Sequence, residues 1–211
     1  MPPPLGQVTD GGNLVKGAAM IAELATVHFI DLYQSLAGNR TANIPVTTRE
    51  DHMTTQLNRF TFGFRMLMAW TFLYAASHQV FNPKFSAGKF LASTKTFHDI
   101  YAPLTDPAID PVLTFLVSYG HLAIGFSLLV GFAVRLSSLA GLALMLLYWT
   151  AHMEWPFIEN HNNFIIDYHI VYGAVCLFLF FNKAGHVLGL DHLAAQLPAV
   201  RQSSLLRAIF H

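Results

Sequence analysis

Charged residues are scarce in this chain. Only 11% of its 211 residues are Asp, Glu, Lys or Arg, whereas 54% are hydrophobic and the mean hydropathy is +0.44. Because a soluble domain carries about 25% charged residues, this composition indicates an integral membrane protein with membrane lipid as its first partner. The formal net charge is zero, so no excess of basic residues points to nucleic acid as a partner.

Cysteine is almost missing as well. The single residue, Cys176, lies in an apolar run, so the chain can form no internal disulfide and contains no CxxC motif. We expect Cys176 to be a small core residue and not a reactive thiol. The first ten residues lack a basic stretch followed by an apolar run, so no cleavable signal peptide is predicted there.

Four apolar runs approach the length of about 20 residues that a membrane-spanning helix needs. They cover residues 60–81, 110–134, 136–152 and 164–181. The second and third runs are joined by a tight turn at Arg135, which allows only an antiparallel hairpin. We therefore predict an all-α integral membrane fold, a four-helix transmembrane bundle with an N-terminal amphipathic helix.

The segments around the runs are more polar. Residues 14–37 place charged side chains on one helical face, which predicts an amphipathic helix at the interface or against a partner; a tilted fifth span is the alternative. Residues 38–58 are predicted to be a polar linker, and the connector 82–108 to hold a short interfacial helix at 87–99. The predicted parts are an N-terminal extension, a four-span domain and a C-terminal tail, at residues 1–56, 57–195 and 196–211.

The basic residues are unevenly distributed between the two sides of the predicted spans. Of the 12 Lys and Arg residues, nine fall on one side and three, Lys84, Lys89 and Lys95, on the other. Since cytoplasmic loops carry the excess of Lys and Arg, the first side, with both termini, is predicted to be cytoplasmic. We expect a multi-pass protein of the cell (plasma) membrane, with the connector 82–108 and the polar loop 154–163 outside.

Residues 149–173 concentrate histidines and carboxylates between two apolar runs. Ionisable groups are costly in hydrocarbon, so such a stretch must reach water or line a cavity. Six side chains can converge here, because the third and fourth spans would be antiparallel neighbours. They are His152, Glu154, Glu159, His161, Asp167 and His169. Three interpretations stay open: a metal site, although no HExxH-type spacing occurs; a loop held by local hydrogen bonds; and a polar mouth that holds a redox headgroup or small anion and moves protons.

His121 lies about ten residues into the second span, near mid-depth. An ionisable group at that depth is a functional hypothesis by default. It would bond a quinone oxygen, relay protons or ligate a haem; a helix–helix hydrogen bond is the structural alternative. Haem ligation needs a second mid-depth histidine, but His152 and His169 lie near the outer third, so a haem is less favoured than a quinone.

Other candidate residues flank this region. Tyr168 and Trp155 stand beside the polar loop and are predicted to line a pocket, whereas the other aromatic residues near span ends are typical of interfacial anchors. Arg65, inside the first span, is expected to extend its side chain to the cytoplasmic interface, with an anion contact as the alternative.

Three segments together resemble the DoxX/DoxD family. They are Arg65 near the start of the first span, the hairpin from Gly120-His121 to Arg135, and the end from Asp167 to Asp191, in which Ala184-Gly185-x-x-x-Gly189-Leu190-Asp191 is the most specific piece. The resemblance covers about residues 57–195.

The resemblance implies a small four-helix membrane protein. Some DoxD-type members are the membrane subunit of thiosulfate:quinone oxidoreductase, which passes electrons from thiosulfate to quinone and forms tetrathionate; others have roles in redox balance. This chain differs at His121, where members commonly have Glu, and at His78-Gln79, close to where they have Lys. A protonatable group is nevertheless kept at mid-depth.

Two hypotheses for the function follow. In the first, the chain is a DoxX-like membrane redox subunit that passes electrons from a small sulfur anion such as thiosulfate to quinone. The predicted catalytic residues are His121, His169, His152, Asp167 and Glu154; the quinone would contact His121, Tyr168 and Trp155, and the anion Lys84, Lys89 and Lys95. With no flavin, haem or iron–sulfur motif, a one-electron carrier would come from other membrane subunits or be absent. In the second, the chain is a non-catalytic accessory or structural subunit of a larger membrane complex. The sequence leaves open whether the chain is catalytic.

Overall fold

The structure is a computed structural model that describes the backbone of residues 46–210 and the side chains of residues 51–210. Contacts between residues divide the chain into two units, 1–53 and 54–211. Within the first unit only the start of one helix is described. The amphipathic helix expected at 14–37 and the N-terminal residues considered for a signal peptide lie outside the described residues.

Helix α2 (Val46–Val80) is longer than the predicted first span. It ends close to the expected residue 81, but it includes residues 46–58, so the polar linker predicted at 38–58 is wrong for these residues. The segment from 46 to 62 contains neither Gly nor Pro, the two residues that break helices most strongly. Residues 46–58 are therefore too polar to belong to an apolar span, but they still form part of the helix.

Helices α5 (Asp110–Val130) and α6 (Val134–Ala151) are both long and apolar enough to cross a membrane. Pro111 lies in the first turn of α5, where proline is well tolerated because the amides there have no helical acceptor. The turn predicted at Arg135 is wrong, because it lies at residues 131–133. Gly131 adopts a left-handed φ of 71° and ends α5, so the chain reverses early and Arg135 is already helical.

The polar loop predicted at 154–163 is wrong, because this segment forms a small antiparallel sheet in the order β1-β2-β3. Its strands are β1 (Met153–Glu154), β2 (Phe157–Ile158) and β3 (Asn160–Phe164). Helix α7 (Tyr168–Phe181) then begins four residues after the predicted start at 164, because the Asp167 side chain caps it. At 14 residues, α7 rises about 21 Å, less than the roughly 30 Å of hydrocarbon.

The connector between α2 and α5 holds short helices. They are α3 (Ala87–Leu91), α4 (His98–Tyr101) and the 3₁₀ helix η1 (Ala102–Thr105). The single helix predicted at 87–99 is wrong beyond Leu91, where the Ser93 and Thr94 hydroxyls donate to carbonyls three residues back and compete with helical bonding. Leu91, Tyr101 and Ala151 form an apolar cluster, so the connector packs on the end of α6.

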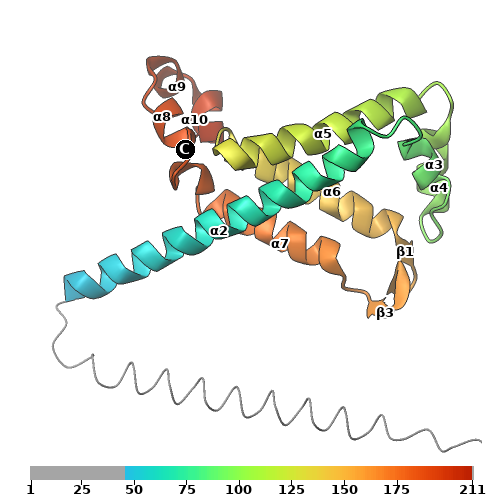
Figure 1. Cartoon of the computed structure of the whole chain (residues 1–211), viewed down its shortest axis with the longest axis horizontal. Coiled ribbons are helices and arrows are strands. Elements are labelled where there is room, and N and C mark those ends of the chain that lie inside the picture. Colours follow the sequence, from blue (N-terminus) through green and yellow to red (C-terminus); the bar gives the residue numbers. More distant parts are fainter. Residues whose placement is uncertain (1–45, 211) are drawn as a thin grey trace, which may run out of the picture. The chain divides into compact units, whose positions relative to one another are not determined.

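The main apolar core forms where α2, α5, α6 and α7 meet. Its buried members include Met68, Ala69, Phe72, Ile124, Leu128, Val134, Met145, Cys176 and Leu179. Cys176 is fully buried, which confirms its prediction as a core residue. Residues 54–210 thus form a helical unit with one small sheet. In this unit α3, α4 and the sheet lie at one end of the long helices, and α8–α10 lie at the other (Figure 1).

Arg65 has no exposed surface, so its expected extension to the interface is wrong. Its guanidinium donates to three backbone carbonyls through Nη1 and Nη2, whereas Nε has no hydrogen-bond partner among the described residues. The acceptors are the oxygens of Ala184, Val187 and Leu188, at 2.6, 2.8 and 3.0 Å. Asp191 is also buried, and its carboxylate accepts from the amides of Ala133 and Val134, at 2.6 and 3.1 Å.

Short helices continue to the end of the described chain. They are η2 (Ala184–His186), α8 (Asp191–Ala194), α9 (Pro198–Gln202) and α10 (Ser204–Phe210). Ala194, Val200 and Phe210 form their own apolar cluster, so the predicted tail folds back on itself as a helical cap.

Candidate functional site

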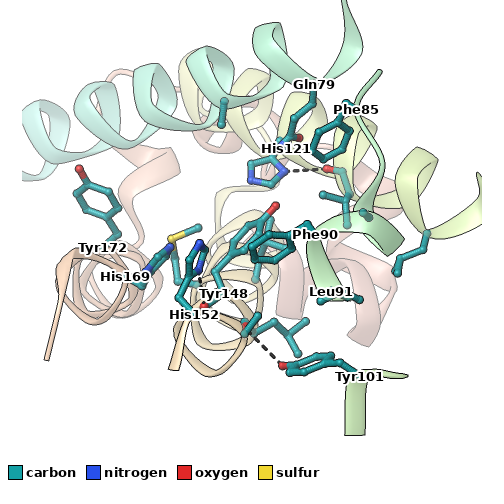
Figure 2. A pocket seen from close by; sticks show the side chains of 18 of the residues that line it. Gln79, Phe85, Phe90, Leu91, Tyr101, His121, Tyr148, His152, His169 and Tyr172 are labelled. Carbon is teal, nitrogen blue, oxygen red and sulfur yellow. Dashed lines mark hydrogen bonds between the residues drawn. The ribbon is translucent and has the colours of Figure 1, made fainter. Parts of the chain in front are cut away.

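A cavity of about 410 Å³ lies between the long helices and the connector. Helices α2, α5, α6 and α7 and the connector all contribute to its walls, and most of the lining surface is apolar. Histidines, tyrosines, a threonine and one glutamine supply the polar groups. Figure 2 shows Gln79 and His121 on one side, His152 and His169 on the other, and Tyr148 between them. The cavity therefore gathers ionisable side chains from three helices.

His121 reaches the cavity from the middle of α5 and is 2% exposed. Its Nδ1 donates to the carbonyl of Val117, one turn back, at 2.8 Å. Its ring lies 5.7 Å from the Phe72 ring and 5.6 Å from the Tyr148 ring. The described residues offer no hydrogen-bond partner to Nε2. The observed bond lies within α5, so it is not the helix–helix bond considered as the structural alternative.

His169 and Asp167 form a buried pair at the start of α7. The imidazole Nδ1 donates to Asp167 Oδ2 at 2.6 Å, and the two side chains are 5% and 0% exposed. The other carboxylate oxygen, Oδ1, accepts from the His169 backbone amide at 3.0 Å. Asp167 therefore orients the imidazole that faces the cavity, an arrangement suited to proton transfer.

Tyr148 and His152 share one face of the last turn of α6. His152 Nδ1 donates to the Tyr148 carbonyl at 2.9 Å, and the His152 ring stacks on the His169 ring at 5.0 Å. The Tyr148 ring lies 5.8 Å from the His169 ring. Since His121 is within 5.6 Å on its other side, Tyr148 connects the histidines of α5 and α7. Tyr168 also lines the cavity, with its ring 4.1 Å from His169.

The structure places other predicted site residues away from the cavity. Glu154 lies on the surface, where Lys95 Nζ is 2.6 Å from its carboxylate. The hydrogen bond from Lys95 lowers the pKa of Glu154. The negative charge of Glu154 in turn balances the positive charge of Lys95. Trp155 is 65% exposed and is not among the cavity residues. Lys84 and Lys89 are exposed side chains of the connector.

Sequence reasoning missed several cavity residues. Gln79 belongs to a stripe of α2 with Thr71 and Ala75, spaced four residues apart, and Tyr172 follows Tyr168 by four on α7. This spacing puts each set on one helical face, which is the signal that could have found them. Tyr148 was expected to be an interfacial anchor, but it lies four residues before His152 on the cavity face.

The arrangement of donors fits neither a metal ion nor a haem between neighbouring histidines. Among residues 51–210, no group of three His, Cys, Asp or Glu side chains is placed to hold a metal ion. A haem with two axial imidazoles needs them on opposite faces of the porphyrin. His152 and His169 instead stack directly on each other, so this pair leaves no place for a porphyrin plane.

Comparison with known proteins gave one match. The family model described as DoxX matches residues 60–153, which run from within α2 to the first residue of β1. The match lies inside the resemblance noted over residues 57–195 and stops before α7. Comparisons with curated proteins and with solved structures gave no match.

Proposed function

The chain contains a DoxX family domain at residues 60–153 and is a membrane protein, and from this premise we propose that it is a quinone-binding redox subunit. The observation that carries the proposal is the cavity in which His121, Tyr148, His152 and His169 converge. Binding sites for small organic molecules are mostly apolar, with a few convergent polar groups and volumes of about 300–1,000 Å³. The 410 Å³ cavity has this character.

A quinone headgroup matches these walls. Its flat ring packs well on aromatic side chains, and Phe90 lies against both Tyr148 and His152, with ring separations of 5.7 and 4.9 Å. Its two oxygens need hydrogen-bonding groups and exchange two protons on reduction. The histidines and Tyr148 supply such groups from opposite sides of the cavity.

The histidines are arranged to move those protons. In His121, His152 and His169, Nδ1 is bound to a carbonyl or carboxylate acceptor. The proton therefore sits on Nδ1, and Nε2 is left as the basic nitrogen. When Nε2 takes up a proton from the outer side of the membrane, such an imidazole can deliver that proton to a quinone oxygen. Asp167 stabilises the charged form of His169 during that step.

We propose thiosulfate as the electron donor, following the resemblance to DoxD-type members. Two thiosulfate ions join through a sulfur–sulfur bond to give tetrathionate and release two electrons; quinone takes up these electrons and two protons to become quinol. Lys84 on the connector can attract the dianion to this end, whereas the charge of Lys89 acts on Asp110 and Lys95 is paired with Glu154. With one cysteine, the chain cannot hold a cysteine-ligated iron–sulfur cluster alone, so a partner subunit would supply the electron carrier.

The same proposal includes a topology. Helices α2, α5, α6 and α7 would be the four spans, with the connector and the sheet outside and the termini in the cytoplasm. The support is the distribution of Lys and Arg, nine against three. In this orientation the cavity lies near the outer leaflet, where quinone arrives from lipid and protons arrive from outside.

An accessory role is the second candidate. Residues 54–60 of α2 are all exposed, so none of the described residues covers this stretch of helix. The apolar Leu57 and Phe60 are 45% and 61% exposed there. A partner subunit that covers this stretch would make the chain a structural member of a larger membrane complex.

Replacing the cavity histidines tests the proposal. The full chain is purified together with the membrane subunits that bind it, and thiosulfate-dependent quinone reduction by this assembly is measured for the native protein, His121→Ala and His169→Ala. Since general acid–base groups contribute about 10²–10⁴-fold, we expect each variant to lose at least about a hundredfold. His192→Ala, an exposed histidine of α8, is the matched control and should keep full activity.

The contrary results are distinct. Full activity in both cavity variants would remove the site assignment. Co-purification in a fixed ratio with larger membrane subunits, with no quinone reduction by that assembly, would favour the accessory role.

A further inference from the structure

The cavity presents hydrogen-bond acceptors more than donors. Each of its three histidines uses Nδ1–H to bind an acceptor of the protein itself: Val117 O at 2.8 Å, Tyr148 O at 2.9 Å and Asp167 Oδ2 at 2.6 Å. A neutral imidazole has one donor and one acceptor nitrogen. In each ring the donor is therefore already used, and the remaining Nε2 can only accept.

Gln79 adds a fourth acceptor. Its side-chain oxygen, Oε1, is buried and has no hydrogen-bond partner among the described residues. The residue lines the cavity beside His121 (Figure 2). The Gln79 side chain also lies close to Tyr148. The amide oxygen is therefore available to a hydrogen-bond donor of a ligand.

A buried acceptor without a partner is costly, about 1–3 kcal/mol. A ligand that brings a donor removes this cost, whereas a ligand that brings only acceptors leaves it in place. The two redox forms of the proposed ligand differ in this respect. Quinone has two carbonyl oxygens, which accept, and quinol has two hydroxyl groups, which donate as well as accept. Tyrosine hydroxyls can either donate or accept a hydrogen bond, so they do not distinguish quinol from quinone.

We propose that the cavity binds quinol more tightly than quinone and that Gln79 is the residue that distinguishes the two redox forms. The inference rests on the proposed function, because it assigns the redox preference of the same site. Gln79 Oε1 accepts one hydroxyl proton of the quinol, and the Nε2 atoms of the histidines accept the other. Gln79 is a specificity-determining residue here; the histidines carry out the proton transfer.

The preference has a consequence for electron transfer. Tighter binding of the reduced form raises the two-electron reduction potential of the bound couple, by about 30 mV for each tenfold ratio of dissociation constants. Quinone bound in the cavity is then a stronger oxidant than quinone in lipid. Two electrons from the sulfur donor and two protons through the histidines complete its reduction, so the site favours the direction proposed above.

Equilibrium binding of a matched redox pair tests the inference. Duroquinone and duroquinol are titrated anaerobically against the detergent-solubilised full chain, with binding to empty micelles subtracted. We expect the native protein to bind duroquinol about tenfold more tightly. This ratio corresponds to about 1.4 kcal/mol, within the range for satisfying one buried acceptor.

Two variants identify the residue responsible. Gln79→Met keeps the side-chain length but removes the amide oxygen, so the affinity ratio should fall to near one, mainly through weaker binding of duroquinol. Gln196→Met is the matched control, because Gln196 is an exposed residue between α8 and α9 and its loss should leave the ratio unchanged.

Each result bears on one of the two proposals. If neither compound binds the native protein above the micelle background, the proposed function fails. If both bind with equal affinity, the redox preference is wrong while quinone binding stands. The native protein alone decides this question, so the inference stays testable if Gln79→Met does not fold. A tenfold ratio that persists in folded Gln79→Met would overturn the assignment to Gln79.

Discussion

Asp167 uses its two carboxylate oxygens for different purposes. Oδ1 accepts from the His169 backbone amide and caps α7, and Oδ2 accepts from His169 Nδ1. The same side chain therefore starts the helix and sets the imidazole that faces the cavity. Because both partners are buried, removing either one leaves an uncompensated polar group.

Two substitutions should separate these roles of Asp167. Asparagine is as good a helix cap as aspartate, so Asp167→Asn should unfold close to the native temperature. The asparagine side chain lacks the negative charge of Asp167, and its amide can donate to His169 Nδ1, which would reverse the tautomer of the imidazole. Quinone reduction should therefore fall by about tenfold to a hundredfold. Asp167→Ala should lose activity and also about 1 kcal/mol of stability. Steady-state kinetics and thermal unfolding measure the two effects. Activity of Asp167→Asn equal to that of the native protein would contradict the electrostatic role of Asp167.

Arg65 should be a structural residue that lysine cannot replace. Its guanidinium donates to three carbonyls near the end of the DoxX-like pattern, a fork that one ammonium group cannot reproduce. With hydrogen bonds from charged groups worth about 1.5–3 kcal/mol each, we expect Arg65→Lys to lower the free energy of unfolding by about 3 kcal/mol. Arg59→Lys, at an exposed position of the same helix, should change it by less than about 0.5 kcal/mol. Equal thermal midpoints for the two variants would argue against a structural role.

The residue types near the site could be predicted from the sequence better than their contacts. His121, His152, His169 and Asp167 stand out as ionisable groups in apolar surroundings, and the structure brings them together. Gln79 carries no charge and gives no such signal. The contacts of Arg65 join residues more than 100 positions apart in the chain, which no local pattern reveals.

The turn between α5 and α6 is held by the segment from η2 to α8. Leu190 N donates to Val130 O and Asp191 N to Gly131 O, while the Asp191 carboxylate accepts from the first amides of α6. Burial raises the pKa of the Asp191 carboxyl, and its hydrogen bonds to these amides and the charge of Arg65 act against that rise. The Gly189-Leu190-Asp191 ending thus has a physical reason, because it fastens the last elements to the hairpin.

Two glycines should respond in opposite ways to alanine. A Cβ on Gly189 would lie 2.3 Å from the Gly185 carbonyl oxygen and 3.0 Å from the Gly131 Cα, so the backbone must move and Gly189→Ala should cost about 2–3 kcal/mol. A Cβ on Gly63 would meet nothing within 4 Å. In the interior of α2, Gly63→Ala should stabilise by about 0.5–1 kcal/mol. Thermal unfolding compares the pair, and a similar midpoint shift in both would refute the close packing of the turn.

Helices with clear end signals were the most predictable elements. Pro111 predicts the start of α5, and the polar Asn182-Lys183 marks the end of α7. The starts of α2 and α7 were missed for opposite reasons. Polar residues before 60 continue the helix because none of them breaks it, whereas the apolar Phe164 joins a strand because its backbone pairs with Phe157. Hydropathy locates apolar runs, but hydrogen bonding decides where each helix begins.

Among the described residues, α5 and α6 are long and apolar enough to span a membrane, whereas α2 is longer but more polar and α7 is apolar but shorter. Helix α7 is too short to cross the hydrocarbon alone, yet Phe164, Ile166 and Phe181 at its ends are 61%, 62% and 70% exposed. Backbone outside a helix is tolerated at membrane depth only when its polar groups are bonded. Ile165 meets this condition, because its amide donates to Pro156 O and its carbonyl accepts from Trp149 Nε1. Phe164 and Ile166 thereby extend the apolar surface of α7 beyond the helix.

Cysteine labelling decides whether α7 crosses the membrane. Asn162 in β3 and Gln202 at the end of α9 are both exposed and lie on either side of α7 in the chain. The native Cys176 is fully buried, so it should give little background with a membrane-impermeant maleimide. We expect Asn162→Cys to react in right-side-out vesicles and Gln202→Cys only in inside-out vesicles. Labelling of both from one side would show that α7 does not span, and the reverse pattern would show that the distribution of Lys and Arg misassigns the cytoplasmic face.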